Sequence, residues 1–452
     1  MNSTDIFLKG INEICLDSIP EHVFDQAKDC FLDYLACAVA GSTYIRSKND
    51  EVIDSLVQEK GNVPIFGSSK KTSMLNAALL NGINSHYIEL DDGHRYGMMH
   101  LGAPIFSALL AINDTEALAP KDFYFAAIVG YEVAIRLARC IQPGNKLKGF
   151  HATGTCGTIG VAMAVATALH FNEVQKKAAF SAAITSAAGV LEMIEGDSEM
   201  KPYNVGRATL DGIVAAYIGK AQFKPPLDAL GGKRGFLKIM TDLCNMQSIT
   251  DFNYDHFEIE GIYRKPYAAC RHLHPSIEGA LKIQETKKIS GQDIDKILVN
   301  TYHLAVFGHD HKDICGVNSA KMSIPYSVAV ALLKGKAGMS EFTEKAITNN
   351  DVLQLAQKVE VQEDENLTSL CPHKRAAIVT VYQKNGKRID MRVDYPKGEP
   401  ENPLSRLDVC TKFRQLASFA QISTDNIEKC IQRIYSNEYY SIADIISPLV
   451  EF

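Results

Sequence analysis

Residues 86–104 hold an unusual number of ionisable side chains for a segment between apolar neighbours. Three carboxylates, three imidazoles and one guanidinium lie in this stretch. Apolar runs at 75–80 and 105–112 flank it and predict buried helices. An unpaired charge near a core costs on the order of several kcal/mol. The chain must therefore fold so that these groups pair with one another, as helix caps and ion pairs, or with a ligand.

Composition limits the class of protein. At 452 residues the chain exceeds what one core usually supports, which predicts two domains. With 46% apolar and 22% charged residues, it resembles an ordinary globular protein. A net charge of −6 provides no basic surface for nucleic acid. No window approaches the roughly 20 apolar residues of a membrane span, so neither nucleic acid nor membrane is expected as a partner.

The cysteines and the N-terminal residues predict a cytoplasmic location. Eleven cysteines are scattered singly, several of them within apolar helical runs, and no Cys-x-x-Cys occurs. This pattern is typical of reduced, packed thiols rather than a disulfide framework, an iron–sulfur centre or a structural zinc site. The first residues also lack the basic and apolar regions of a signal peptide.

The spacing of apolar residues predicts a mainly α protein with an α+β insertion. From about 20 to 260 the helical period dominates, apart from a short extended piece near 63–67. After 262, alternating segments and an Asn385-Gly386 turn indicate strands and a hairpin, with helices between them. Helical spacing returns beyond 403. We expect a large helical domain over 1–262 and 401–452, and a smaller α+β domain over 263–400.

Two polar islands lie among the helices of the larger domain. His151 stands just before a helix that contains Gly154, Gly157 and Gly160, and backbone amides at a helix start attract an anion. Those glycines do not match the dinucleotide-binding pattern, and close helix packing is the simpler explanation. The second island contains Lys201 and Asn204. Its lysine suits an anionic ligand or a salt bridge to the acidic residues of the first stretch.

Further candidates lie in the α+β region. Lys265, Arg271 and His274 form a basic cluster beside a helix start, which predicts an anion site or a solvated basic loop. His272 and His274 have no acidic partner or third ligand nearby, so no metal site is predicted. Tyr326 opens a helix, where it can donate a proton or simply pack.

Together the islands contain histidines, carboxylates and a tyrosine for proton transfer, and lysines and arginines for carboxylate binding. This combination favours abstraction of a proton next to a carboxylate, where cations stabilise the developing charge. The absence of a G-x-S-x-G motif disfavours a serine hydrolase.

Five motifs in series resemble those of the MmgE/PrpD family, which includes 2-methylcitrate dehydratase, cis-aconitate decarboxylase and iminodisuccinate epimerase. The resemblance spans essentially the whole chain. The motifs are His86-Tyr-Ile-Glu-Leu-Asp-Asp-Gly-His with His100-x-Gly-Ala-Pro, Gly149-Phe-His-Ala-Thr-Gly-Thr-Cys-Gly, Lys201-Pro-x-Asn-x-Gly, Lys265-Pro-Tyr-x-x-Cys-Arg-x-x-His274 and Ser323-Ile-Pro-Tyr326.

The resemblance implies a homodimer, a helical domain with an α+β lid, an active site in the cleft between them, and no cofactor. It implies a lyase of a small di- or tricarboxylate, most simply a 2-methylcitrate dehydratase. A cis-aconitate-type decarboxylase, an epimerase and a non-catalytic polyanion-binding protein are the alternatives. Glu89 and Gly93 differ from the usual family motif. The predicted catalytic residues are Asp92, His100, His151, Lys201, His274 and Tyr326, and the predicted substrate-binding residues are Glu89, Asn204, Lys265 and Arg271.

Overall fold

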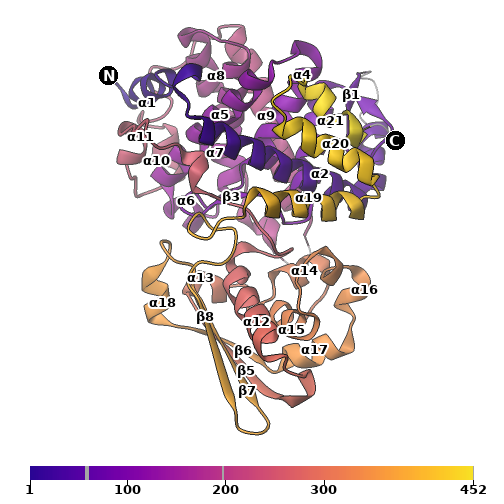
Figure 1. Ribbon diagram of the computed structural model, residues 1–452. Helices are drawn as coiled ribbons and strands as arrows, with labels where there is room; N and C mark the ends of the chain where they lie inside the picture. Colours follow the sequence, from indigo (N-terminus) through magenta and orange to yellow (C-terminus); the bar gives the residue numbers. More distant parts are fainter. Residues whose placement is uncertain (56–60, 196–197, 451–452) are drawn as a thin grey trace. The chain divides into compact units, whose positions relative to one another are not determined.

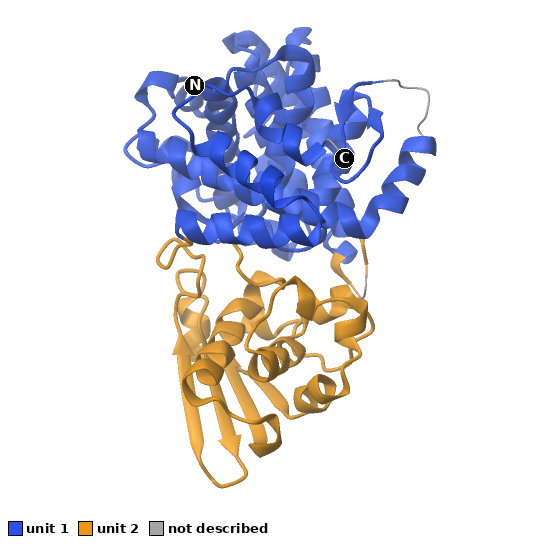
Figure 2. Ribbon diagram, turned by 45° about the vertical axis from the view of Figure 1, so that its right-hand side comes forward, with its two compact units in different colours: residues 1–193, 200–263, 405–452 blue, residues 194–199, 264–404 orange. Residues whose placement is uncertain are grey.

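The computed structural model describes residues 1–55, 61–195 and 198–450. The chain divides into two compact units (Figure 2). Unit 1 comprises 1–193, 200–263 and 405–452, and unit 2 comprises 194–199 and 264–404. The predicted fold class is confirmed, because the chain is mainly α-helical with a smaller α+β part. Within the described ranges, no helix combines the length and the hydropathy that crossing a bilayer requires.

Unit 1 is a set of helices around an apolar core, and α7 lies at its centre. Every residue of α7 is buried. This helix packs against α4, α5, α8 and α9. The helices of unit 1 are α1 Ser3–Asn12, α2 Glu21–Ser55, α3 Met74–Tyr87, α4 Gly102–Glu116, α5 Pro120–Ile141, α6 Gly144–Leu147, α7 Ala152–Ala168, α8 Glu173–Ser186, α9 Met200–Lys220, α10 Phe236–Met240, α11 Gln247–Thr250, α19 Arg406–Phe419, α20 Thr424–Tyr435 and α21 Ile442–Val450.

Two pairs of short antiparallel strands complete unit 1. Strands β1 (Val63–Pro64) and β2 (Lys71–Thr72) form one pair, which agrees with the extended piece predicted near 63–67. Strands β3 (Gly93–His94) and β4 (Ile262–Tyr263) form the other. The second pair connects the polar stretch of residues 86–104 to residues 262–263, where the chain leaves unit 1 for unit 2.

Small residues bring the central helices close together. A Cβ atom built on Gly160 of α7 would lie 2.7 Å from the Cβ of Ala134 and 2.8 Å from the carbonyl oxygen of Gly130, both in α5. A Cβ on Gly130 would in turn lie 2.9 Å from the Cβ of Ala164. Real side chains do not approach so closely, so these positions need glycine. The packing role predicted for Gly160 is therefore confirmed.

Residues 405–452 return to unit 1 after the whole of unit 2. In Figure 1 the yellow helix α19 runs beside the indigo helix α2, although more than three hundred residues separate them in the chain, and the two helices are in contact. The core of unit 1 is thus completed by two segments that are distant in sequence.

Unit 2 contains a four-stranded sheet in the order β6-β5-β7-β8. Strand β5 pairs in parallel with β6 and antiparallel with β7, and β7 pairs antiparallel with β8. Helix α12 packs on β7 and β8. The elements are α12 His274–Lys287, β5 Ile294–Thr301, α13 His303–Val306, α14 Val317–Met322, α15 Ile324–Lys334, α16 Glu344–Ile347, α17 Asn350–Gln357, β6 Val359–Glu363, α18 Glu365–Leu370, β7 Ala377–Gln383 and β8 Arg388–Val393.

The predicted hairpin is confirmed. The amide of Gln383 donates to the carbonyl of Lys387 at 2.8 Å, and Gly386 between them has φ +82°. A left-handed residue at this point of a short hairpin loop suits glycine, because a Cβ there would be strained.

The close contact between α5 and α7 predicts the effect of adding one methyl group. Gly160→Ala would force Cβ against α5 and should lower the free energy of unfolding by about 1–3 kcal/mol, as overpacked cores do. Urea titration of both proteins measures the difference. Gly157→Ala in the same helix is the matched control, because its Cβ would meet nothing nearer than 3.7 Å. Equal losses in the two variants would contradict the packing argument.

Candidate active site

One carboxylate holds two imidazoles at the centre of the polar stretch. Nδ1 of His86, near the end of α3, donates to Oδ2 of Asp91 at 2.8 Å, and Nδ1 of His100 lies 3.2 Å from the same oxygen. The two rings stand edge to face with centroids 4.6 Å apart. Burial alone would raise the pKa of Asp91, but the charges of His100 and His86 outweigh it and hold the pKa well below its usual range. Asp91 is therefore ionised, and its carboxylate contacts Nδ1 of both rings.

The neighbouring Asp92 performs a different task. Its carboxylate accepts hydrogen bonds from the Tyr131 hydroxyl at 2.6 Å and from the Gly102 amide at 2.9 Å, at the first residue of α4. Its backbone carbonyl accepts from Nδ1 of His100 at 2.7 Å. Burial raises the pKa of Asp92 to about 6, against the opposing effect of the Tyr131 hydrogen bond. Asp92 thus anchors the start of α4 and orients His100.

Glu89 and Lys201 form an ion pair beside the two imidazoles. Lys201 lies in the first turn of α9, and its ammonium contacts Oε1 of Glu89. The same oxygen lies 3.5 Å from Nε2 of His86. Glu89 has φ +58°, a left-handed conformation that is uncommon for a residue with a side chain and is found at functional sites. A salt bridge from Lys201 to an acidic residue of the first stretch was one of its two expectations, and it is present with Glu89.

His151 is held as a neutral base. It is the N-cap residue of α7, so its predicted place at a helix start is confirmed. Its Nδ1 donates to Oδ1 of Asn204 at 2.8 Å, which leaves Nε2 as the nitrogen with the lone pair. Burial, reinforced by the charge of Lys201, lowers the pKa of His151 to about 3. A neutral imidazole with a fixed tautomer is suited to accept a proton.

A further hydrogen bond links helix α7, which begins just after His151, to the loop of His100. The amide of His100 donates to the Thr153 hydroxyl at 3.0 Å, and Thr153 lies two residues after His151 in α7. The side-chain nitrogen Nδ2 of Asn204 donates to the backbone carbonyl of Ala188 at 3.3 Å, which fixes the orientation of the Asn204 side chain. Unit 1 therefore brings together Glu89, Asp92, His100, His151, Lys201 and Asn204 of the predicted set.

The four predicted residues of unit 2 lie in hydrogen-bonded or buried positions there. His274 is fully buried; its Nδ1 accepts from Arg271 at 2.8 Å, and its Nε2 donates to the Ala269 carbonyl at 3.1 Å. Arg271 also pairs with Glu399 at 2.8 Å. The ammonium-bearing side chain of Lys265 is buried as well. Arg271 and His274 thus contact each other within unit 2, and their predicted roles in substrate binding and catalysis stay predictions.

Tyr326 is also engaged within unit 2. Its hydroxyl donates to the backbone carbonyl of Glu341 at 2.8 Å. Burial raises its pKa to about 12, with a smaller effect of the Glu341 charge. These contacts agree with a packed tyrosine, one of the two expectations for Tyr326, and its predicted catalytic role stays a prediction.

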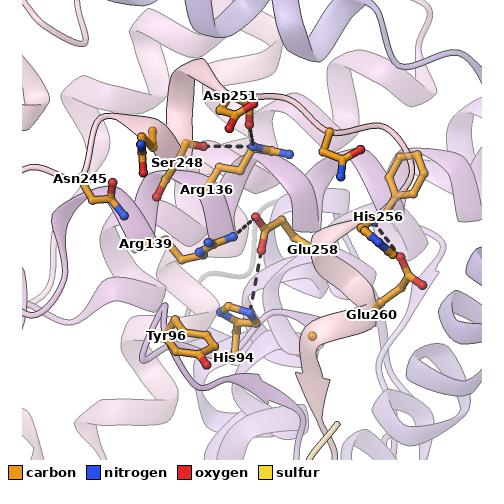
Figure 3. Close-up of a pocket in the computed structure, with 14 residues that line it drawn as sticks. His94, Tyr96, Arg136, Arg139, Asn245, Ser248, Asp251, His256, Glu258 and Glu260 are labelled. Atoms are coloured by element: carbon orange, nitrogen blue, oxygen red, sulfur yellow. Dashed lines mark hydrogen bonds and ion pairs between the residues drawn. The ribbon is translucent and has the colours of Figure 1, made fainter. Parts of the chain in front are cut away.

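A separate pocket of unit 1 has among its lining residues His94, which belongs to the same polar stretch as His100. It measures about 500 Å³ and lies beside α5 and residues 245–261. Figure 3 shows Arg139 paired with Glu258, which also approaches His94 at 3.9 Å. The amide of His94 donates to the Met99 carbonyl at 2.9 Å, and Nδ1 of His94 accepts from the Gly97 amide at 3.0 Å. These paired groups support the loop just before His100.

Another contact comes from residues 405–452. Nζ of Lys412 in α19 donates to the carbonyl of Leu90 at 2.6 Å and to Oδ1 of Asp33 at 2.7 Å, and all three residues are buried. Leu90 lies between Glu89 and Asp91. Helix α19 therefore fixes the backbone from which both carboxylates project.

Several residues of the site were not among the predicted catalytic or binding residues. His86 and Asp91 belong to the polar stretch of residues 86–104. Their position next to the predicted residues Glu89 and Asp92 could have identified them. Tyr131, Thr153 and Lys412 carry no such signal, because their partners Asp92, His100 and Leu90 lie far away in the sequence.

Comparisons with known proteins come to the same family as the motifs. The model of the MmgE/PrpD N-terminal domain matches residues 8–247, and that of the MmgE/PrpD C-terminal domain matches residues 267–435. Three relatives share low identity over nearly their whole lengths. They are the cis-aconitate decarboxylase-like protein oryM of Aspergillus oryzae, 23% identical over 97% of this chain and 95% of the relative; the cis-aconitate decarboxylase of Aspergillus terreus, 25% identical over 90% and 87%; and that of Homo sapiens, 23% identical over 99% and 94%.

Removal of the Lys412 ammonium should destabilise unit 1. Lys412→Met leaves the carboxylate of Asp33 buried without its cation, which we expect to lower the free energy of unfolding by about 3–5 kcal/mol. Urea unfolding followed by circular dichroism measures this change. Lys429→Met is the control, because its pair with Asp425 is exposed and should contribute less than about 1 kcal/mol. Similar midpoints for both variants would show that the Lys412 pair is not a buried anchor.

His151 should make stability depend on pH. In the unfolded chain its imidazole takes up a proton near pH 6.5, whereas in the folded protein, with a pKa of about 3, it stays neutral. The stability that this group contributes is therefore present above pH 6.5 and is lost as the pH falls. Between pH 7 and pH 5 the unfolding free energy should fall by about 2 kcal/mol more in the wild type than in His151→Gln. Parallel pH profiles would contradict the neutral state.

Proposed function

The chain belongs to the MmgE/PrpD family, and on that basis we propose that it is a lyase of a small di- or tricarboxylate, most simply a dehydratase of the 2-methylcitrate type. The observation that carries this proposal is the pairing of opposite proton-transfer groups in unit 1. His151 is neutral, whereas His86 and His100 share the ionised carboxylate of Asp91. Elimination of water needs one base and one acid, and these environments separate the two roles.

The base step falls to His151. Its Nε2 takes the proton from the carbon next to a substrate carboxylate, and the electrons of the C–H bond form the new C=C bond. Asn204 keeps the proton of Nδ1 in place, so the second nitrogen stays available throughout. His151 is buried, and water therefore competes little for its lone pair.

The acid step falls to His100. The leaving hydroxyl takes a proton from its imidazolium as the C–O bond breaks, and water departs. Asp91 stabilises the imidazolium before the transfer, and the carbonyl of Asp92 fixes the orientation of the ring. His151 then releases its proton to solvent and His100 takes one up, which restores the starting state.

Lys201 is the proposed partner of a substrate carboxylate. Its ammonium is paired with Glu89 in the structure. A substrate carboxylate would take over this ammonium, and the positive charge would then stabilise the negative charge that develops on the adjacent carbon. Glu89 would be left beside His86, where a proton or a cation can balance its charge.

Decarboxylation is the second candidate, because the three relatives described above carry the name cis-aconitate decarboxylase or a name derived from it. Loss of carbon dioxide leaves a carbanion, which Lys201 stabilises and an imidazolium quenches by donating a proton. The same residues serve this reaction, but only the acid is needed. The effect of removing His151 therefore distinguishes the two reactions.

The test is proton NMR of the EDTA-treated protein in deuterated water with 2-methylcitrate, citrate and cis-aconitate. Dehydration predicts formation of the unsaturated acid and exchange at the carbon next to the carboxylate. His151→Gln should lower kcat by about 10²- to 10⁴-fold with a smaller change in KM, because it removes a proton-transfer group. Loss of carbon dioxide that survives this substitution would favour decarboxylation instead.

His22→Gln is the matched control. His22 is an exposed histidine of unit 1 that pairs with Glu260, and its removal should leave kcat unchanged. If the folded wild type neither exchanges, dehydrates nor decarboxylates any of these acids, the proposed substrate class is wrong.

The predicted homodimer and the cytoplasmic location stay predictions.

A further inference from the structure

Three side chains of the polar stretch direct ligand atoms toward one another. A ring nitrogen of His86, a ring nitrogen of His100 and a carboxylate oxygen of Glu89 all lie within 4.8 Å of one another. The separation between Nε2 of His86 and Oε1 of Glu89 is 3.5 Å. A tetrahedral ion with bonds near 2.1 Å would separate its ligands by about 3.4 Å. The pair of His86 and Glu89 already has this spacing, and the separations to the third ligand need to shorten by about 1.4 Å at most.

The hydrogen bonds of Asp91 orient both rings as metal ligands are oriented. The Asp91 carboxylate contacts Nδ1 of His86 and Nδ1 of His100. Each ring therefore offers its Nε2 on the opposite edge. A carboxylate behind a histidine is the usual outer partner of a metal-bound imidazole, because it fixes the ring and increases its basicity. Here one carboxylate serves two rings.

The His86 nitrogen that faces Glu89 is a buried polar atom in need of a partner. Nε2 of His86 makes no hydrogen bond, although its residue is fully buried. A buried polar atom left in this way is destabilising by about 1–3 kcal/mol, so it calls for an explanation. The left-handed backbone of Glu89 holds a carboxylate in front of it. A cation between the two atoms would satisfy the His86 nitrogen.

We propose that His86, Glu89 and His100 form a binding site for a divalent transition-metal ion of the zinc type. Two imidazoles and one carboxylate match the ligands of Zn²⁺ and Co²⁺, whereas Mg²⁺ and Ca²⁺ prefer oxygen ligands throughout. Three protein ligands leave a fourth position open. The three ligands lie close together in sequence. His86 lies in the last turn of a helix, whereas Glu89 and His100 follow in irregular backbone, so their spacing matches no regular metal-binding pattern.

Lys201 and the ion compete for the same carboxylate. The ammonium of Lys201 contacts Oε1 of Glu89, the oxygen that also faces His86. Two cations cannot share this position without strong repulsion, so the ion binds only as Lys201 moves away. An ion bound there also occupies the ring nitrogens needed for proton transfer. It follows, on the basis of the proposed function, that the ion inhibits the lyase.

Binding is tested on the chelator-stripped protein without substrate. Co²⁺ is followed by its visible absorption, and Zn²⁺ by calorimetry. We expect one ion per chain. Asp91→Asn should weaken binding by about 10- to 100-fold, as loss of an outer carboxylate does, and His86→Gln should weaken it at least as much. Lys201→Met should tighten binding, because the competing ammonium is gone. His22→Gln, at an exposed histidine paired with Glu260, is the control and should leave the affinity unchanged.

The binding measurements test the ion site independently of the proposed lyase activity. No cobalt absorption and no heat with Zn²⁺, in a protein whose circular dichroism is native, would overturn the site. Binding that survives both His86→Gln and Asp91→Asn would place the ion elsewhere and would also overturn it. Weaker binding in Lys201→Met would contradict the competition. Because these measurements use no substrate, they stand whether or not the protein dehydrates any acid, and inhibition by Zn²⁺ is read afterwards from the NMR assay.

Discussion

The ionised carboxylate of Asp91 is the centre on which the site depends. It lies among apolar helices, where an isolated charge would be expelled, and it is retained because His86 and His100 both donate to it. The position of His100 follows from this contact together with the Asp92 carbonyl and the Thr153 hydroxyl. The polar stretch is therefore a single hydrogen-bonded network, and its charges cannot be moved one at a time.

Close packing of small residues brings that network next to His151. A Cβ on Gly154 of α7 would lie 2.3 Å from Oδ1 of Asn204, so the approach of α9 to α7 depends on a glycine there. Gly206 of α9 permits a similar approach to α3, since its Cβ would lie 2.4 Å from the Leu79 carbonyl. The histidine, its amide partner and the acidic loop come from three helices that could not meet with larger residues.

Sequence patterns predicted the architecture better than the site. The helical and alternating periods separated the helical unit from the α+β unit, and Asn385-Gly386 marked the hairpin, because these features are local. The site was predicted only in part. Asp91 and Asp92 are neighbours in sequence, and nothing local distinguishes the one that contacts two imidazoles from the one that caps α4. Arg271 and His274 were predicted to belong to an anion site or a solvated basic loop, and the pairing of Arg271 with Glu399, more than a hundred residues later, could not be predicted from the local sequence.

Helix α19 has a consequence for the order of events during synthesis. The ammonium of Lys412 holds the Leu90 carbonyl between the two carboxylates of the loop, and it lies beyond the whole of unit 2 in the chain. A nascent chain that has emerged only as far as residue 404 therefore has every ionisable group of the loop but not the cation that secures its backbone. The loop reaches its final geometry only after translation has passed α19. A ribosome-bound intermediate would thus hold an incomplete site for most of the time that the protein is being made.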